Sequence, residues 1–315
     1  MRRENKLFLK YAGPSITGML IAGSFSIVDT LFIGQGTGKN GLAAVSLTWP
    51  LIMLFGAAGE LIGSGAAVLI SQFRGSGEMD KAQSVFGNML TLNILMAAVL
   101  FGIFYPSLEP LLKLFGAQEE LLPTALSYAK IMTCGAVICM LMESFIAIIR
   151  NDGRPMLSMF LLVVGLLGNI VLDYLFILHF HWGAPGAAYA TVISQGISAL
   201  LGTGYFLSSG TSLKYSWNTL KLKGPQTRAI LLTGIPVFGN MLSVIAMLFM
   251  HNLQALRYGA VDGLAAYTLV AALESLGSLL MTGLAMGIQP LTAYSTGPDS
   301  TNDRTEWETV PTNGL

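Results

Sequence analysis

The sequence predicts an all-α, polytopic membrane protein. Only 11% of its 315 residues are charged, against about a quarter in ordinary globular domains, and 53% are hydrophobic. The hydrophobic residues form continuous stretches of about 20 residues or more, the length that a helix needs to cross a bilayer. They do not alternate with polar residues at every second position, which disfavours a membrane β-barrel.

Eight membrane-spanning helices are expected between charged or Gly- and Pro-rich breaks. The longest break, residues 208–228, separates the first six helices from the last two. The expected helices cover residues 9–34, 42–72, 82–106, 121–149, 155–179, 185–208, 228–257 and 263–294.

The positions of Lys and Arg predict the orientation of these helices. One side of the membrane receives 12 of them and the other side three, Lys39, Lys113 and Arg257. Because loops rich in Lys and Arg stay in the cytoplasm, the N-terminus is predicted to be cytoplasmic. The 12 residues of that side are Arg2, Arg3, Lys6, Lys10, Arg74, Lys81, Arg150, Arg154, Lys214, Lys221, Lys223 and Arg228.

Several classes of function find no support in the sequence. The balance of 17 basic and 17 acidic residues indicates no nucleic-acid binding. There is no GxxxxGK[ST] loop for ATP, no metal-binding cluster and no nucleophile–His–acid set, so an enzyme is not expected and neither is a cofactor. Cys134 and Cys139 lie in one expected helix at a spacing that suits neither a disulfide nor a metal, so packing roles are expected for both.

An internal repeat is visible at an offset of 222 residues. It aligns the two starts on the same side of the membrane, with six helices between them, which predicts a parallel repeat of the kind found in transporters. The offset pairs "GLAA" at 41–44 with "GLAA" at 263–266, Pro14 with Pro236, Met19 with Met241, Leu20 with Leu242, Leu51 with Leu273, Gly65 with Gly287 and Gly75 with Gly297.

The register of the repeat ends after Gly297, where a polar sequence replaces the third helix of the first copy. This predicts a first lobe at residues 1–222, a partial second lobe at 223–297 and a polar tail at 298–315. The favoured interpretation is a twelve-helix protein cut short after its eighth helix. The alternative is a genuine eight-helix protein with a short cytoplasmic tail.

Four polar residues are expected at one level of the outer leaflet. Asp29 lies five residues before the outer end of the first helix, and Asp173 lies six residues before the outer end of the fifth. Asn169 is one helical turn from Asp173, and Thr191 lies six residues into the sixth helix. Two carboxylates, an amide and a hydroxyl could hold and release a proton, or could coordinate Na⁺ with oxygen ligands. The alternative is that these groups only make buried hydrogen bonds between helices.

The other ionisable residues of the spans are weaker candidates. Glu60 and Glu274 could attract a cationic substrate, and His251 is the repeat equivalent of Asp29, which suggests a second titrating site. Glu143 could reach water or a basic loop residue, and Lys130 could extend its ammonium group toward the membrane surface.

Several segments resemble the multidrug and toxic compound extrusion (MATE) transporters, and within that family the MepA-like and DinF-like bacterial members. The resemblance covers residues 1 to about 297. Its carriers are "GPSITGMLIAGSFSIVDTLFIG" at 13–34, "RNDGRPMLSMFLLVVGLLGNIVLDYLFIL" at 150–178, "GAPGAAYATVISQ" at 183–195 and "GIQPLTAYSTG" at 287–297.

The resemblance implies two six-helix lobes around a central cleft, in the plasma (inner) membrane. It implies export of cationic or amphipathic drugs in exchange for H⁺ or Na⁺, with no ATP and no other partner than membrane lipid. It also implies an ion site at Asp29, Asn169, Asp173 and Thr191. The acid that some members carry in the seventh helix is missing, since no Asp or Glu occurs between Leu231 and Arg257.

Two alternatives to drug antiport remain open. The first is a flippase for lipid-linked precursors, which would be expected to have a strongly cationic cavity. The second is a fragment that does not transport.

Overall fold

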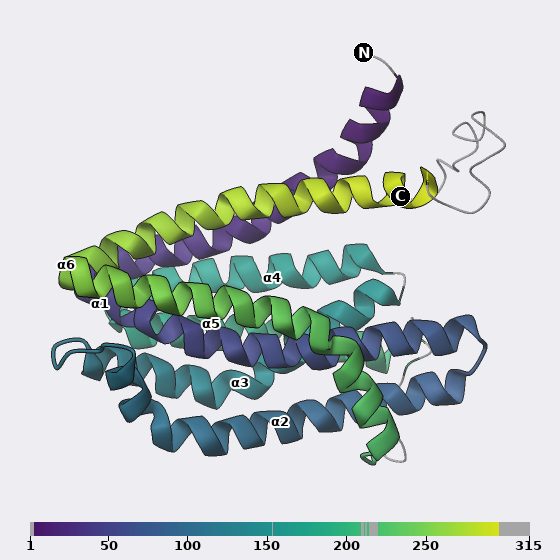
Figure 1. Cartoon of the computed structure of the whole chain (residues 1–315), viewed down its shortest axis with the longest axis horizontal. Helices are drawn as coiled ribbons and strands as arrows, with labels where there is room; N and C mark the ends of the chain where they lie inside the picture. Colours follow the sequence, from purple (N-terminus) through teal and green to yellow (C-terminus); the bar gives the residue numbers. More distant parts are fainter. Residues whose placement is uncertain (1–2, 153, 209–210, 212, 214–219, 296–315) are drawn as a thin grey trace. The chain divides into compact units, whose positions relative to one another are not determined.

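The computed structural model describes residues 3–152, 154–208, 211, 213 and 220–295, and every regular element in them is helical (Figure 1). The predicted polar tail, residues 298–315, lies outside the described residues. The elements are α1 (Arg3–Gly75), α2 (Met79–Leu114), α3 (Leu122–Asn151), α4 (Pro155–Asp173), the π-helical segment η1 (Tyr174–His179), α5 (Gly183–Leu207) and α6 (Gly224–Ser295).

The two longest helices each join two of the predicted spans at a sharp kink. The kink of α1 is at Gly38 (φ 66°, ψ −165°), and the kink of α6 is at Ala260 (φ 48°, ψ −147°). Ala260 lies 222 residues after Gly38 (260 minus 38), which is the offset of the predicted repeat. In the described part of the chain six helices are long and apolar enough to cross a membrane, so the prediction of an all-α polytopic membrane protein is confirmed.

The chain divides into two compact units, residues 25–272 and residues 1–24 together with 273–315. The described part of the smaller unit consists of the first turns of α1 and the last turns of α6. The larger unit contains α2 to α5 and all the contacts described below. The predicted boundary between lobes at residue 222 rests on the repeat, and it stays a prediction.

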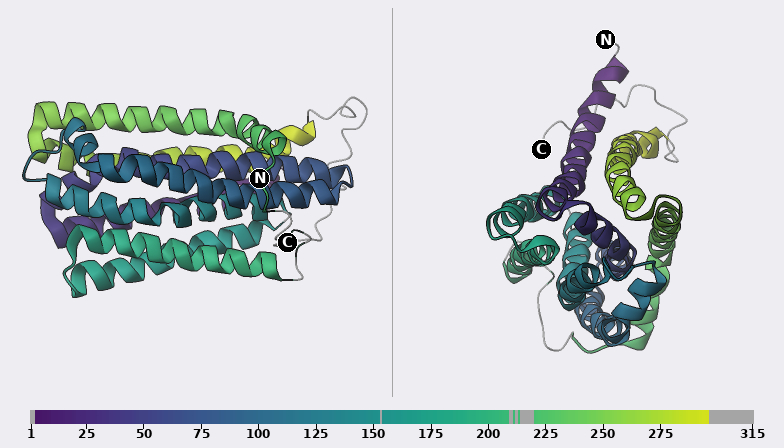
Figure 2. Two further views of the ribbon diagram at one scale, coloured as in Figure 1. Left: turned by 90° about the horizontal axis from the view of Figure 1, so that it is seen from below. Right: turned by 90° about the vertical axis from the view of Figure 1, so that its left-hand side faces the viewer.

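Within the larger unit, α3 is the central helix. It packs against α2, α4 and α5, and Figures 1 and 2 show these four helices side by side. The second half of α1 also crosses α3 closely. A Cβ atom added at Gly63 would lie 2.4 Å from the Cα atom of Ser144, and one added at Gly59 would lie 2.6 Å from the Cα atom of Met140. Glycine therefore lets the two backbones touch, as is common between membrane helices.

The predicted end of the third span at residue 106 was wrong. The helix α2 continues through Pro106 and Pro110 to Leu114. Leu108 and Leu112 in this extension are buried in an apolar cluster with residues of α1 and α3. Burial of these side chains favours the helix more than the two prolines, each of which removes one backbone donor, oppose it.

Candidate functional site

The structure brings the four predicted coupling residues together inside the larger unit. Asp29 comes from α1, Asn169 and Asp173 from α4, and Thr191 from α5. All four are buried, with 4%, 0%, 0% and 8% of their surfaces exposed, respectively. Counting residues along the helices predicted that these four side chains lie at the same depth, and in the structure they lie together.

Asp29 and Asp173 form a pair of carboxyl groups. The two carboxyl groups are close enough to interact with each other. Two carboxylates offer only acceptors and repel each other, so a hydrogen bond between them requires a proton on one of the two. Such a pair can hold one proton.

The amide of Asn169 connects this pair to α5. As oriented in the structure, its Nδ2 atom donates to Thr191 Oγ1 at 3.4 Å. Rotating the amide by 180° satisfies both of its ends: Nδ2 then donates to Asp173 Oδ2 at 2.9 Å, and the amide oxygen accepts from the Thr191 backbone N–H at 3.3 Å. In this second orientation Asn169 holds Asp173 in place and leaves the Thr191 hydroxyl available to a ligand.

The local backbone explains why α1 can approach Asp173. The π-helical segment η1 begins directly after Asp173, and such segments often occur at functional sites. Gly36 of α1 lies against Ile177 of η1, where a Cβ atom would be only 2.1 Å from Ile177 Cγ2. The absence of a side chain at Gly36 brings α1, and with it Asp29, close to the end of α4.

The chemistry of these groups fits a small cation. One oxygen of each carboxyl group, Asp29 Oδ1 and Asp173 Oδ1, is buried without a hydrogen-bond partner among the described residues. A buried acceptor without a partner is costly, and a bound proton or Na⁺ would remove that cost. Together with the Asn169 oxygen or the Thr191 hydroxyl, the two carboxyl groups supply the oxygen ligands that hard cations prefer.

A cavity of about 200 Å³ opens beside this group. Asp29 and Thr191 line it, whereas Asn169 and Asp173 lie behind them. Asp29 therefore belongs both to the buried carboxyl pair and to the wall of the cavity. The remaining lining residues are mostly aromatic or apolar: Trp49, Ile52, Met53, Phe55, Gly56, Tyr128, Met132, Cys139, Glu143 and Gln195.

The sequence analysis did not identify one residue of the cavity, Tyr128, and ranked another, Glu143, as a weak candidate. Tyr128 is 2% exposed, interacts electrostatically with both carboxyl groups, and lies six residues after the start of α3 at Leu122. This is the depth that was expected for Thr191, so the same residue count applied to tyrosines would have found it. Glu143 also faces the cavity, which the sequence could not show because counting along a helix gives depth but not the direction of a side chain.

The three secondary candidates are placed differently. Glu60 is half-buried near Glu143, and Arg150 interacts with both carboxylates. His251 does not join the site: it is exposed, its Nδ1 atom lies 2.8 Å from the carbonyl oxygen of Met247, and its ring stacks on Tyr267. Glu274 is exposed and belongs to the smaller unit, so its place relative to the site is not described. Among the described residues, no carboxylate forms an ion pair with His251, so the structure gives no support to a second site there.

Three minor expectations can also be compared with the structure. Lys130 is exposed, as expected for a side chain that extends away from the core. Cys134 and Cys139 are both free thiols, the first exposed and the second buried beside the cavity.

Comparisons with a family model, with curated proteins and with solved structures all point to one family of transporters. A protein-family model described as MatE matches residues 14–175. The multidrug export protein MepA of Staphylococcus aureus (strain MSSA476) is 28% identical over 293 residues, which are 92% of this chain and 64% of MepA. The protein of the same name from Staphylococcus haemolyticus (strain JCSC1435) is 26% identical over the same shares. The chain thus spans 64% of the length of these curated relatives.

Solved structures share the fold over most of the chain. The MATE multidrug transporter DinF-BH, solved in complex with a dye, superposes with a TM-score of 0.82 at 30% identity, over 92% of this chain and 65% of that one. A multidrug resistance MATE transporter of the MOP superfamily in an inward-facing conformation gives 0.79 at 26% identity, over 89% of this chain and 62% of that one.

Proposed function

Because the chain belongs to the MatE family of multidrug and toxic compound extrusion transporters, we propose that it acts in secondary active drug efflux. Cationic or amphipathic compounds leave the cell in exchange for H⁺ or Na⁺ moving inward. The protein lies in the plasma (inner) membrane with its N-terminus in the cytoplasm, as the distribution of Lys and Arg favours.

The observation that supports antiport best is that Asp29 belongs both to the carboxyl pair and to the wall of the cavity. Its carboxyl group neighbours that of Asp173 on one side and lines the cavity on the other. A proton or Na⁺ at the pair neutralises Asp29 and weakens its attraction for a cation in the cavity. Conversely, a cationic substrate beside Asp29 favours loss of the bound ion. Such mutual exclusion couples the two movements, because linkage between two ligands is reciprocal.

The cavity wall supports a cationic or amphipathic substrate. Trp49, Phe55 and Tyr128 offer aromatic faces, and Met53 and Met132 offer adaptable apolar contacts. Asp29 and Glu143 add two carboxyl groups to the same wall. This combination suits flat organic cations of varied shape better than one defined polar metabolite.

The same wall argues against a flippase for anionic lipid-linked precursors. Such a substrate needs Lys or Arg to bind its phosphate groups. The residues that line this cavity include two acids and neither Lys nor Arg.

Transport by the purified chain in proteoliposomes tests the proposal. With ethidium as substrate, we expect efflux driven by an imposed pH or Na⁺ gradient in the wild type. We expect loss of this ion-driven efflux in Asp29→Asn and in Asp173→Asn. Asp80→Asn is the matched control, because Asp80 is an exposed carboxylate at the start of α2. Gradient-driven efflux that persists in both site variants would overturn the coupling role.

A further inference from the structure

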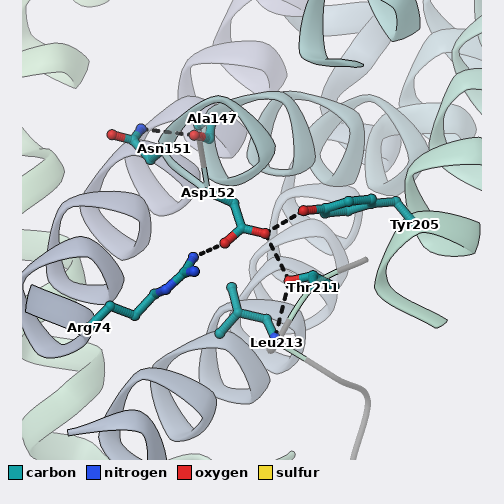
Figure 3. Close-up of polar contacts among 7 residues, drawn as sticks. All are labelled: Arg74, Ala147, Asn151, Asp152, Tyr205, Thr211 and Leu213. Carbon is teal, nitrogen blue, oxygen red and sulfur yellow. Dashed lines mark hydrogen bonds and ion pairs between the residues drawn. The ribbon is translucent and has the colours of Figure 1, made fainter. Parts of the chain in front are cut away.

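A second polar cluster lies far from the candidate ion site, around Asp152 in the turn between α3 and α4 (Figure 3). Tyr205 of the cluster and Thr191 of the ion site are both on α5, 14 residues apart (205 minus 191), or about 21 Å along the helix. Asp152 is predicted to lie at the cytoplasmic ends of the helices, beside the basic residues Arg74, Arg150 and Arg154.

Three other segments of the chain contact the Asp152 carboxylate. Arg74, in the last turn of α1, forms an ion pair with Oδ1. Oδ2 accepts hydrogen bonds from the Tyr205 hydroxyl near the end of α5 and from the Thr211 hydroxyl at 2.8 Å. Thr211 lies beyond α5, at the start of the segment that leads to α6, and its hydroxyl oxygen also accepts the Leu213 backbone N–H at 3.1 Å.

Burial makes this cluster more than a surface ion pair. The Asp152 side chain is 3% exposed, and Leu213 is 0% exposed. A buried carboxylate requires its partners, since removal of one leaves a charge without compensation. The start of the connecting segment is thus held both by a charged hydrogen bond and by an apolar anchor.

The other described end of this segment is also fixed to the larger unit. The Thr91 hydroxyl of α2 donates to the Leu220 carbonyl oxygen at 2.6 Å, and Asn88 Nδ2 donates to the Lys223 carbonyl oxygen at 3.1 Å. The Lys223 ammonium group donates to Ser84 Oγ at 2.9 Å. Contacts at both ends therefore attach the connection between the repeats to the helices of the first repeat.

We propose that Asp152 is the centre of a clamp that fixes the connection between the two repeats to the first lobe. Arg74 orients the carboxylate, and the carboxylate holds Thr211 and thereby seats Leu213. In a transport cycle, which rests on the proposed function, both described ends of the connection then travel with the first lobe. Asp152 acts through Thr211 and Leu213 and is a positioning residue.

Cysteine labelling of the purified chain in lipid nanodiscs tests the clamp without any transport measurement. Leu213→Cys is introduced in a Cys134→Ala background, so that the native Cys139, buried beside the cavity, reports on the integrity of the fold. With a maleimide probe, we expect Asp152→Asn and Arg74→Gln to label the thiol at position 213 at least about tenfold faster than the parent, with Cys139 still protected. Glu78→Gln is the control, since Glu78 forms an exposed ion pair with Lys81 in the neighbouring turn.

The Asp152→Asn or Arg74→Gln variant could unfold the lobe, and then the thiols at positions 213 and 139 would both react. A milder variant tests the clamp in that case. Thr211→Val removes one hydroxyl and leaves the Arg74–Asp152 pair intact, so it should expose position 213 and leave Cys139 protected. Labelling at position 213 that stays at the parent rate in Thr211→Val, or in a folded Asp152→Asn variant, would overturn the clamp. Neither result depends on whether the chain transports ethidium.

Discussion

The crossing of α1 and α3 at Gly63 gives the sharpest prediction about packing. In Gly63→Ala the new Cβ atom would lie 2.4 Å from the Cα atom of Ser144 and 3.0 Å from its Oγ atom. Ordinary contact between such carbon atoms is about 3.5–4.0 Å, so the two helix backbones must separate by roughly 1 Å. Overpacking of this kind costs about 1–3 kcal/mol.

Separation at this point also disturbs a buried hydrogen-bond group. The Ser144 hydroxyl donates to the Gly59 carbonyl oxygen at 2.9 Å and contacts Asn93 of α2. Lengthening these bonds adds to the cost, because the groups are buried and have no water to replace the lost partner. We therefore expect Gly63→Ala to lower the free energy of unfolding by at least the packing cost.

Thermal unfolding of the purified chain, followed by circular dichroism, measures this effect. A loss of about 1–3 kcal/mol corresponds to a decrease in Tm of roughly 2–10 °C. Gly56→Ala is the matched control, because it lies two turns earlier on α1 and no atom lies within 4 Å of its added Cβ. Equal Tm values for the Gly63→Ala and Gly56→Ala variants would refute the close crossing.

Two further predictions concern the second repeat. Ala260→Gly should raise Tm, because the alanine has φ 48° and ψ −147°, a strained conformation that costs about 1–3 kcal/mol. Glycine adopts this conformation freely, as it does at the equivalent Gly38. An unchanged Tm would show that the kink is relaxed in solution. The Ser46 hydroxyl donates to Asn252 Oδ1 at 3.2 Å, and Asn252 Nδ2 donates to the Ser46 backbone carbonyl oxygen at 2.8 Å. Because Ser46→Ala keeps the backbone carbonyl, a double-mutant cycle of Ser46→Ala and Asn252→Ala measures the side-chain bond alone. We expect a coupling of about 0.6 kcal/mol, and additive effects would contradict the contact.

The sequence predicts the helices well because the bilayer imposes simple demands on length and apolar composition. It also predicts the repeat, whose two kinks at Gly38 and Ala260 share one backbone conformation although only one of them is glycine. The prediction fails at the end of α2, where prolines suggested a break. Only the burial of Leu108 and Leu112 against other helices reveals why the helix continues.

The candidate site, too, was predictable from the sequence in part only. Depth along each helix placed Asp29, Asn169, Asp173 and Thr191 at one level, and the structure brings them together. Depth alone gives no rotation of a helix about its axis, so the position of Glu143 in the cavity wall could not be predicted.

The Asp152 cluster escaped prediction for a different reason. Its partners Arg74, Tyr205 and Thr211 lie 53 to 78 positions away in the sequence, and only the packed lobe brings them to one carboxylate. In the sequence Asp152 lies between Arg150 and Arg154, and no pattern there distinguishes it from other charged residues.

The affinity of the purified chain for ethidium, measured by fluorescence as a function of pH and Na⁺ concentration, tests the shared role of Asp29 most directly. If the coupling ion and the cationic substrate exclude each other there, affinity decreases as the pH is lowered or as Na⁺ is added, by up to about tenfold per tenfold change in the competing ion. In Asp29→Asn this dependence disappears. Binding of the same strength at every pH and Na⁺ concentration in the wild type would contradict antiport through Asp29.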